Sequence, residues 1–168
     1  MSNAATSSPR WDPAFIADVI KAYDVRGLVD EQITVDFVRA VGQSFSRLMR
    51  SEGALSVVVA HDMRDSGPEL AEAFAEGVTE QGLNVINIGL ASTDEMYCAS
   101  GLLQVPGAMF TASHNPAAYN GIKLCRAGAR PVGQDTGLAT ISQELAEGVP
   151  ESNGAHGHVT NRDMLQDY

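Results

Sequence analysis

The sequence predicts a three-layer α/β/α domain with a mixed, mostly parallel sheet. Short apolar runs of strand length alternate along the chain with longer segments whose apolar residues recur at helical spacing. The chain has 168 residues, of which 44% are hydrophobic and 19% charged, and this composition suits a globular domain. Residues 11–148 contain the whole alternating pattern. We expect residues 1–10 to be disordered and residues 149–168 to be a linker followed by the beginning of a second domain.

Five segments have helical periodicity and recognisable boundaries. Asp12 precedes Pro13, and these residue types favour the cap and the first turn of a helix. Ser92 and Glu95 have the spacing of a capping box. Gly53 and Gly82 follow apolar stripes and predict helix ends. The expected helices cover residues 12–20, 34–52, 66–82, 92–104 and 136–147.

The strands are predicted from short runs rich in Val, Ile and other apolar residues. Continuous apolar runs are typical of strands that are covered on both faces. We expect strands over residues 55–60, 84–88, 108–111 and 122–125. Asn120-Gly121 predicts a hairpin turn before the last of them, because this dipeptide favours tight hairpins. Residues 21–27 break the helical period and are interpreted as a loop.

Charge and cysteine usage exclude several classes of partner. Eleven Lys and Arg against 21 Asp and Glu leave a net charge of −10. We therefore expect no nucleic-acid or membrane partner, because binding to either depends on clustered cations. The chain shows no apolar run of membrane-spanning length and no secretory signal. Cys98 and Cys125 lack the spacing of a metal or redox motif, so we expect two buried thiols and a cytoplasmic location.

The segment most indicative of chemistry is residues 111–116, which directly follows a predicted strand. Strand ends of α/β proteins commonly carry reactive groups. Ser113 offers a hydroxyl, His114 a proton carrier, and Asn115-Pro116 a stiff turn. Alternation in the next strand places Lys123 opposite in orientation to its apolar neighbours, where it could return towards Ser113. On residue chemistry alone, a turn-capping Ser113 with solvated His114 and Lys123 remains the more common arrangement.

Four ordered motifs resemble one enzyme family. Residues 107–123, Gly-Ala-Met-Phe-Thr-Ala-Ser-His-Asn-Pro-Ala-Ala-Tyr-Asn-Gly-Ile-Lys, closely resemble the phosphoserine loop of the α-D-phosphohexomutases. Residues 21–27 resemble the family's N-terminal phosphate-contacting loop, residues 62–67 its D-x-R-x-S-G turn, and residues 89–93 the segment that ordinarily continues with Pro. Two residues depart from the pattern: His61 replaces a usual Gly, and Asp94 replaces the usual Pro. The resemblance covers nearly the whole chain but only the first of four family domains.

The resemblance implies roles for particular residues. Ser113 would carry the phosphoryl group and exchange it with a hexose phosphate through a hexose 1,6-bisphosphate intermediate. Lys123 would handle the proton of the attacking hydroxyl. His114 would hydrogen-bond substrate or phosphate, although a loop-shaping role is an equal alternative. The implied phosphate and substrate contacts are Arg26, Tyr23 and Asn115. For Tyr23, half-buried packing is the alternative, and Arg64 with Asp65 is interpreted as a structural, salt-bridged turn.

The same resemblance implies a cofactor, substrates and further domains. Mg²⁺ would bind an oxygen of the phosphoryl group on Ser113, with its remaining ligands outside this chain. Tyr119-Asn120-Gly121 resembles the phosphomannomutase/phosphoglucomutase branch, so mannose or glucose phosphates are the expected substrates. Domains II–IV of the same protein would complete the cleft, and this domain alone should be inactive. The alternative from another class is a non-catalytic sugar-phosphate-binding module.

Overall fold

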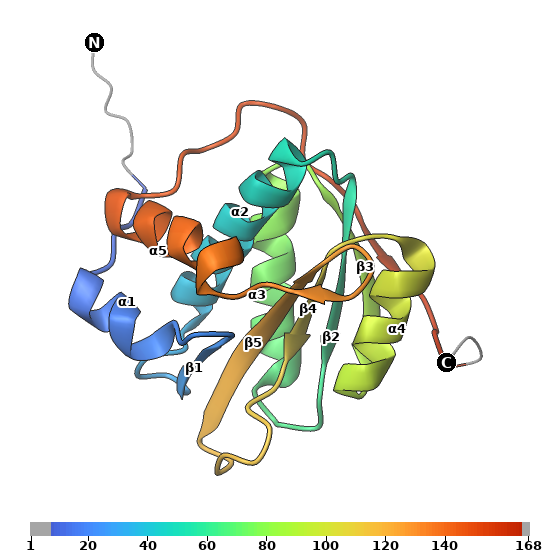
Figure 1. Ribbon diagram of the computed structural model, residues 1–168, viewed down its shortest axis with the longest axis horizontal. Helices are drawn as coiled ribbons and strands as arrows, with labels where there is room; N and C mark the ends of the chain where they lie inside the picture. The colour runs from blue at the N-terminus through green and yellow to red at the C-terminus, as the bar shows by residue number, and fades with distance from the viewer. Residues whose placement is uncertain (1–7, 166–168) are drawn as a thin grey trace.

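The structure is a computed structural model, and it describes residues 8–165. Of residues 1–10, which were predicted to be disordered, residues 1–7 lie outside the described residues. Figure 1 shows the order of the elements along the chain. They are α1 (Pro13–Val19), β1 (Val25–Leu28), α2 (Val35–Ser51), β2 (Ser56–His61), α3 (Gly67–Glu80), β3 (Asn84–Leu90), α4 (Thr93–Leu103), β4 (Gly107–Phe110), β5 (Tyr119–Arg126), β6 (Arg130–Pro131), the 3₁₀ turn η1 (Gln134–Thr136), α5 (Leu138–Glu147) and β7 (Val159–Asn161).

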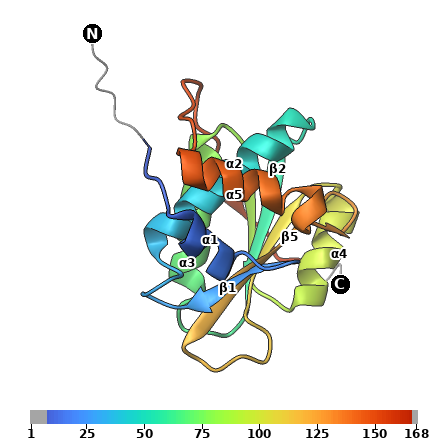
Figure 2. The same cartoon turned by 60° about the vertical axis from the view of Figure 1, so that its left-hand side comes forward.

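Within residues 8–165 a seven-stranded sheet forms the middle layer. Its order is β1-β5-β4-β2-β3-β7, and β6 pairs with the C-terminal end of β5, at Cys125 and Arg126. The larger part, β4-β2-β3-β7, is parallel, whereas β5 runs antiparallel to β1, β4 and β6. Helices α1, α2, α3 and α5 lie on one face and α4 on the other (Figures 1 and 2). The predicted three-layer fold with a mixed, mostly parallel sheet is confirmed.

Strand alternation divides the core between the two faces of the sheet. In β2, Val57 and Val59 join the cluster under α2 and α3, whereas Val58 and Ala60 join the cluster under α4. Successive side chains of a strand point to opposite faces, so a strand covered on both sides must be apolar throughout. This explains the continuous apolar run of β2.

Two of the predicted helix starts are built as expected. The Asp12 carboxylate accepts a hydrogen bond of 2.8 Å from the amide of Ala14, and Pro13 is the first residue of α1. At α4 the Ser92 hydroxyl accepts from the Glu95 amide at 3.0 Å, and the Glu95 carboxylate accepts from the Ser92 amide at 3.2 Å. These bonds satisfy amides that have no partner inside the helix.

The prediction that residues 21–27 are entirely loop is wrong. Val25 to Gly27 belong to β1, where Val25 pairs with Ile122 and Arg26 with Gly121 of β5. The strand is only four residues long and lies at the edge of the sheet. Its pairing with a segment nearly a hundred residues later leaves no local pattern from which to predict it.

The predicted hairpin turn at Asn120-Gly121 is also wrong, because both residues lie inside β5. The Asn120 side chain is buried and donates a hydrogen bond of 2.8 Å to the Ser66 hydroxyl. A Cβ atom on Gly121 would come closer than 3.0 Å to the Val25 carbonyl oxygen of β1. Glycine therefore serves here for close approach of two strands and not for a turn conformation.

Three features were not predicted. The short strand β6 was missed, and β7 extends the sheet by pairing in parallel with β3. Cys98 is half-buried, so the expected burial of both thiols is correct only for Cys125.

No helix in residues 8–165 combines the length and apolar character that a membrane span requires.

Candidate active site

Ser113 lies on the loop that connects the end of β4 to the start of β5. Its side chain is exposed, and its backbone has φ of +54°, a left-handed conformation that is unusual for a residue with a side chain. The Ser113 amide donates to the Thr111 hydroxyl at 3.0 Å. The Asn115 side-chain amide donates to the Ala112 carbonyl at 2.8 Å, and the Asn115 backbone amide donates to the same carbonyl at 3.0 Å. The serine is therefore presented to solvent by a loop with an ordered internal structure.

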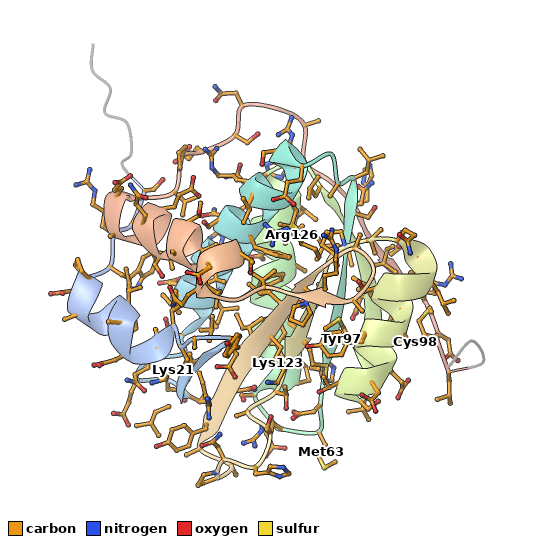
Figure 3. The ribbon with its side chains drawn as sticks, in the orientation of Figure 1. Lys21, Met63, Tyr97, Cys98, Lys123 and Arg126 are labelled. Atoms are coloured by element: carbon orange, nitrogen blue, oxygen red, sulfur yellow. The ribbon has the colours of Figure 1, made fainter. Side chains whose placement is uncertain are left out.

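The Arg64 side chain holds this loop by hydrogen bonds to its backbone carbonyls. Its guanidinium donates to the carbonyl oxygens of Ser113 at 3.0 Å and of Asn115 at 2.8 Å. The second terminal nitrogen donates to the carbonyls of Pro116 at 2.8 Å and of Tyr119 at 2.9 Å. Figure 3 shows Met63, the neighbour of Arg64, at the end of the molecule where the β4–β5 loop turns. Arg64 does lie in a salt-bridged turn, but its ion pair is with Asp62 and not with Asp65, and the sequence interpretation missed the contact with the serine loop.

Arg26 and Lys123 come from neighbouring strands and share one carboxylate. Asp24 Oδ1 lies 3.5 Å from Arg26 Nη2, and Asp24 Oδ2 lies 3.6 Å from Lys123 Nζ. Directly opposed residues of paired strands face the same side, and residues two apart in one strand do so as well. Arg26 opposes Gly121, which precedes Lys123 by two positions, so both cations project from the α4 face of the sheet.

The local charge of this group is positive although the chain is acidic overall. Asp24 has 14% of its side chain exposed, compared with 37% for Arg26 and 30% for Lys123. Two cations with one carboxylate leave one positive charge in excess, in a chain whose net charge is −10. Such a group favours binding of a small anion. Asp24 was not among the predicted site residues, although its position between two candidate contacts was visible in the sequence.

The other predicted residues, Tyr23 and His114, are both exposed at the surface. Tyr23 is 75% exposed, and its ring lies beside Gly133, where an added Cβ would be 3.1 Å from Cδ1. The alternative of half-buried packing for Tyr23 therefore does not hold. His114 is exposed on the serine loop. Figure 3 shows Lys123 on β5.

The structure brings some of the predicted residues together and leaves others apart. Arg26 and Lys123 are joined through Asp24, and Ser113, His114 and Asn115 share the loop held by Arg64. Among residues 8–165, no hydrogen bond or ion pair links Lys123 to the serine loop. A bound group would therefore have to bridge the two parts.

The described part of the chain does not provide a complete metal site. No group of three or more His, Cys, Asp and Glu side chains within residues 8–165 is placed to hold an ion. Divalent magnesium requires several oxygen ligands in near-octahedral geometry. The residues present do not fit the expected Mg²⁺ by themselves, and its remaining ligands would have to come from elsewhere.

Fold and site together define an α/β/α domain with a serine-bearing loop at a strand end, and the sequence comparisons assign it to a family. Residues 17–150 match the family described as phosphoglucomutase/phosphomannomutase, alpha/beta/alpha domain I. The chain belongs to this family. A phosphomannomutase from Vibrio cholerae is 42% identical over 130 residues, which are 76% of this chain and 28% of that protein. A phosphomannomutase from Salmonella typhimurium is 37% identical over 155 residues, covering 88% of this chain and 33% of that protein.

The fold is also similar to that of a solved structure from the same family. A phosphoglucomutase/phosphomannomutase family protein from Burkholderia thailandensis superposes with a TM-score of 0.82 and 28% identity, covering 94% of this chain and 34% of the other. The chain therefore spans about a third of the length of these relatives. The resemblance to the α-D-phosphohexomutases, through their first domain, is confirmed.

The two departures from the family pattern are accommodated locally. Asp94 is exposed in the first turn of α4, where a carboxylate interacts favourably with the helix dipole. His61 packs against Gly67, where an added Cβ would lie 3.1 Å from the His61 Cβ. A side chain at position 67 would therefore fit only if His61 shifted by a few tenths of an ångström.

Proposed function

We propose that this chain is the serine-bearing first domain of a hexose phosphate mutase of the phosphomannomutase/phosphoglucomutase type. The observation that supports this most is the exposure of Ser113 together with its left-handed backbone conformation. Its hydroxyl is exposed on a loop held by four carbonyl contacts to one guanidinium, and its backbone is in the left-handed region. Strained conformations that the surroundings enforce are concentrated at functional sites.

In the proposed reaction, phosphorylated Ser113 donates its phosphoryl group to a hexose monophosphate. A sugar hydroxyl oxygen attacks the phosphorus, a new O–P bond forms, and the bond between phosphorus and Ser113 Oγ breaks. The proton of the sugar hydroxyl ends on Ser113 Oγ, with Lys123 as its carrier. The resulting hexose 1,6-bisphosphate returns its other phosphoryl group to Ser113, so that the covalent intermediate divides the transfer into two feasible steps.

The cationic group acts on the charge of the transferred phosphate. Arg26 provides a planar donor suited to phosphate oxygens, and Asp24 orients it together with Lys123. Tyr23 and His114, both exposed, contact the substrate or its phosphate. Asn115 acts on the phosphate through the loop, because its amide is engaged with the Ala112 carbonyl.

Further components come from outside the described residues. Mg²⁺ would be held by a phosphoryl oxygen on Ser113 together with donors of other domains, and it would supply charge neutralisation when bound. Domains II–IV supply the sugar contacts that distinguish mannose from glucose phosphate. We place the protein in the cytoplasm, because both of its cysteines are unpaired.

The test is formation of phosphoserine. The whole polypeptide that carries this chain is incubated with hexose 1,6-bisphosphate and Mg²⁺, and its intact mass and peptide masses are measured. We expect one added phosphoryl group, about 80 Da, on the peptide that contains Ser113. The Ser113→Ala variant should lack it, and Ser51→Ala, at an exposed serine in α2, should retain it. Sugar-phosphate binding without any adduct would instead support a non-catalytic binding module.

A further inference from the structure

The contacts of Arg64 are made to one kind of atom. All four hydrogen bonds from its terminal nitrogens go to backbone carbonyl oxygens between Ser113 and Tyr119, at 2.8 to 3.0 Å. The side chain is 11% exposed. A guanidinium has a rigid planar array of donors, so a single side chain can fix several acceptors relative to one another. Arg64 therefore determines the position of the loop backbone, and Ser113 with it.

Arg64 is itself fixed by the turn that follows β2. Its amide donates to Asp62 Oδ1 at 3.1 Å, and its Nε lies 3.7 Å from Asp62 Oδ2. The Asp62 amide donates to the Phe110 carbonyl at the end of β4 at 3.0 Å. The base of the turn is thus joined to the strand from which the serine loop emerges.

A second contact joins the same turn to the far end of the loop. The buried Asn120 side chain donates to the Ser66 hydroxyl at 2.8 Å. Ser66 makes no side-chain hydrogen bond to the start of α3, so its hydroxyl is available for this contact. The turn of residues 62–67 therefore holds both ends of the serine loop.

The direction of these contacts has a consequence for a phosphoryl group on Ser113. All peptide bonds in the described residues are trans, and in a trans peptide the N–H and the C=O point in opposite directions. Since the Ser113 carbonyl points to Arg64, the N–H of His114 in the same peptide points away from Arg64. Carbonyl oxygens repel a phosphate dianion, whereas an N–H attracts it. Arg64 thus turns acceptor atoms of the loop away from the exposed side of Ser113.

We propose that Arg64 is a positioning residue for phosphoryl transfer: it holds the serine loop by its carbonyls, keeps Ser113 in the left-handed conformation, and directs the His114 N–H to the phosphoryl side. This inference rests on the proposed function of Ser113. Arg64 acts only through the loop and does not contact the substrate. The D-x-R-x-S-G turn thereby has a function in the site besides starting α3.

The test compares Arg64→Gln and Arg64→Lys with Arg47→Gln, in the whole polypeptide. Arg47 pairs with Glu144 between α2 and α5 and serves as a control for loss of an arginine in an ion pair. Amide hydrogen exchange is measured over residues 111–119 and over α2. For Arg64→Gln we expect exchange in the loop to increase about 10-fold or more with α2 unchanged. Arg64→Lys should resemble it, because one ammonium cannot bond four dispersed carbonyls.

Kinetics provide the second measurement. We expect Arg64→Gln to lower kcat for phosphoserine formation about 100-fold with little change in KM, because a displaced nucleophile loses its attack geometry. Unchanged loop exchange, or an unchanged kcat in a phosphorylatable protein, would overturn the inference. If the unaltered protein forms no phosphoserine, the proposed function fails, while hydrogen exchange still decides whether Arg64 holds the loop. If Arg64→Gln does not fold, Arg64→Lys, which keeps the charge, serves for the same comparison.

Discussion

Replacing Gly121 by alanine tests how closely β1 must approach β5. A Cβ at this position would come nearer than 3.0 Å to the Val25 carbonyl oxygen, a separation that real Cβ atoms essentially never show. The obstructing atom is backbone in a paired strand, so relief requires β1 to move. Forcing an extra carbon into a packed region costs about 1–3 kcal/mol, which exceeds the gain of about 0.5–1 kcal/mol from a less flexible unfolded chain.

Gly101→Ala is the matched control, because the same chemical change should have the opposite sign. Gly101 lies within α4, and nothing comes within 4 Å of an added Cβ. Alanine should stabilise this helix by about 0.5–1 kcal/mol.

The assay is urea unfolding of both variants, with thermal unfolding as a second measure. A chain of this size should shift in Tm by about 2–4 °C per kcal/mol, downwards for Gly121→Ala and upwards for Gly101→Ala. Because Arg26 opposes Gly121, Gly121→Ala should also weaken the hexose phosphate binding that we propose for the whole polypeptide. Equal stability of the two variants would show that the strands do not approach as closely as described.

Three further substitutions or treatments have expected outcomes. Burial alone would raise the pKa of the Glu80 carboxyl, but hydrogen bonds from Arg39 and Gln43 outweigh it and lower this pKa. Glu80 therefore stabilises the fold above its unfolded pKa and loses this contribution as pH falls through the folded value. Glu80→Gln should cost about 1 kcal/mol in urea unfolding at neutral pH, and this cost should decrease as the pH falls through the folded pKa. Burial raises the pKa of the Cys125 thiol, so iodoacetamide should label it only after unfolding, and labelling of the folded protein, seen in peptide masses, would contradict its burial. Ser92→Ala removes the capping box of α4 and should lower stability by about 1 kcal/mol, whereas an unchanged Tm would show that the cap contributes nothing.

Local signals were sufficient for the elements that depend on neighbouring residues. The capping box at Ser92 and the cap at Asp12 require only residues within one helical turn, and both are present as predicted. The apolar run of β2 predicted burial on both faces without any knowledge of what covers it. The family resemblance was carried by short contiguous motifs, which a single sequence displays directly.

Non-local contacts explain the failures. Asn120-Gly121 has the composition of a turn, but pairing with β1 and the bond to Ser66 outweigh that local preference. β1 exists only because β5 lies beside it, and nothing within residues 21–28 indicates the partner. Tertiary pairing overrides weak local propensity wherever a segment is short and at a sheet edge.

The sequence by itself determined the layers of the fold, the loop that bears Ser113 and the family, because periodicity and contiguous motifs are properties of the linear chain. Only the tertiary structure decided which charges meet and what holds the loop. Asp24 joins Arg26 to Lys123, and Arg64 reaches carbonyls about fifty positions away in the chain. These contacts depend on strand register and on the direction of backbone carbonyls, neither of which is encoded in neighbouring residues.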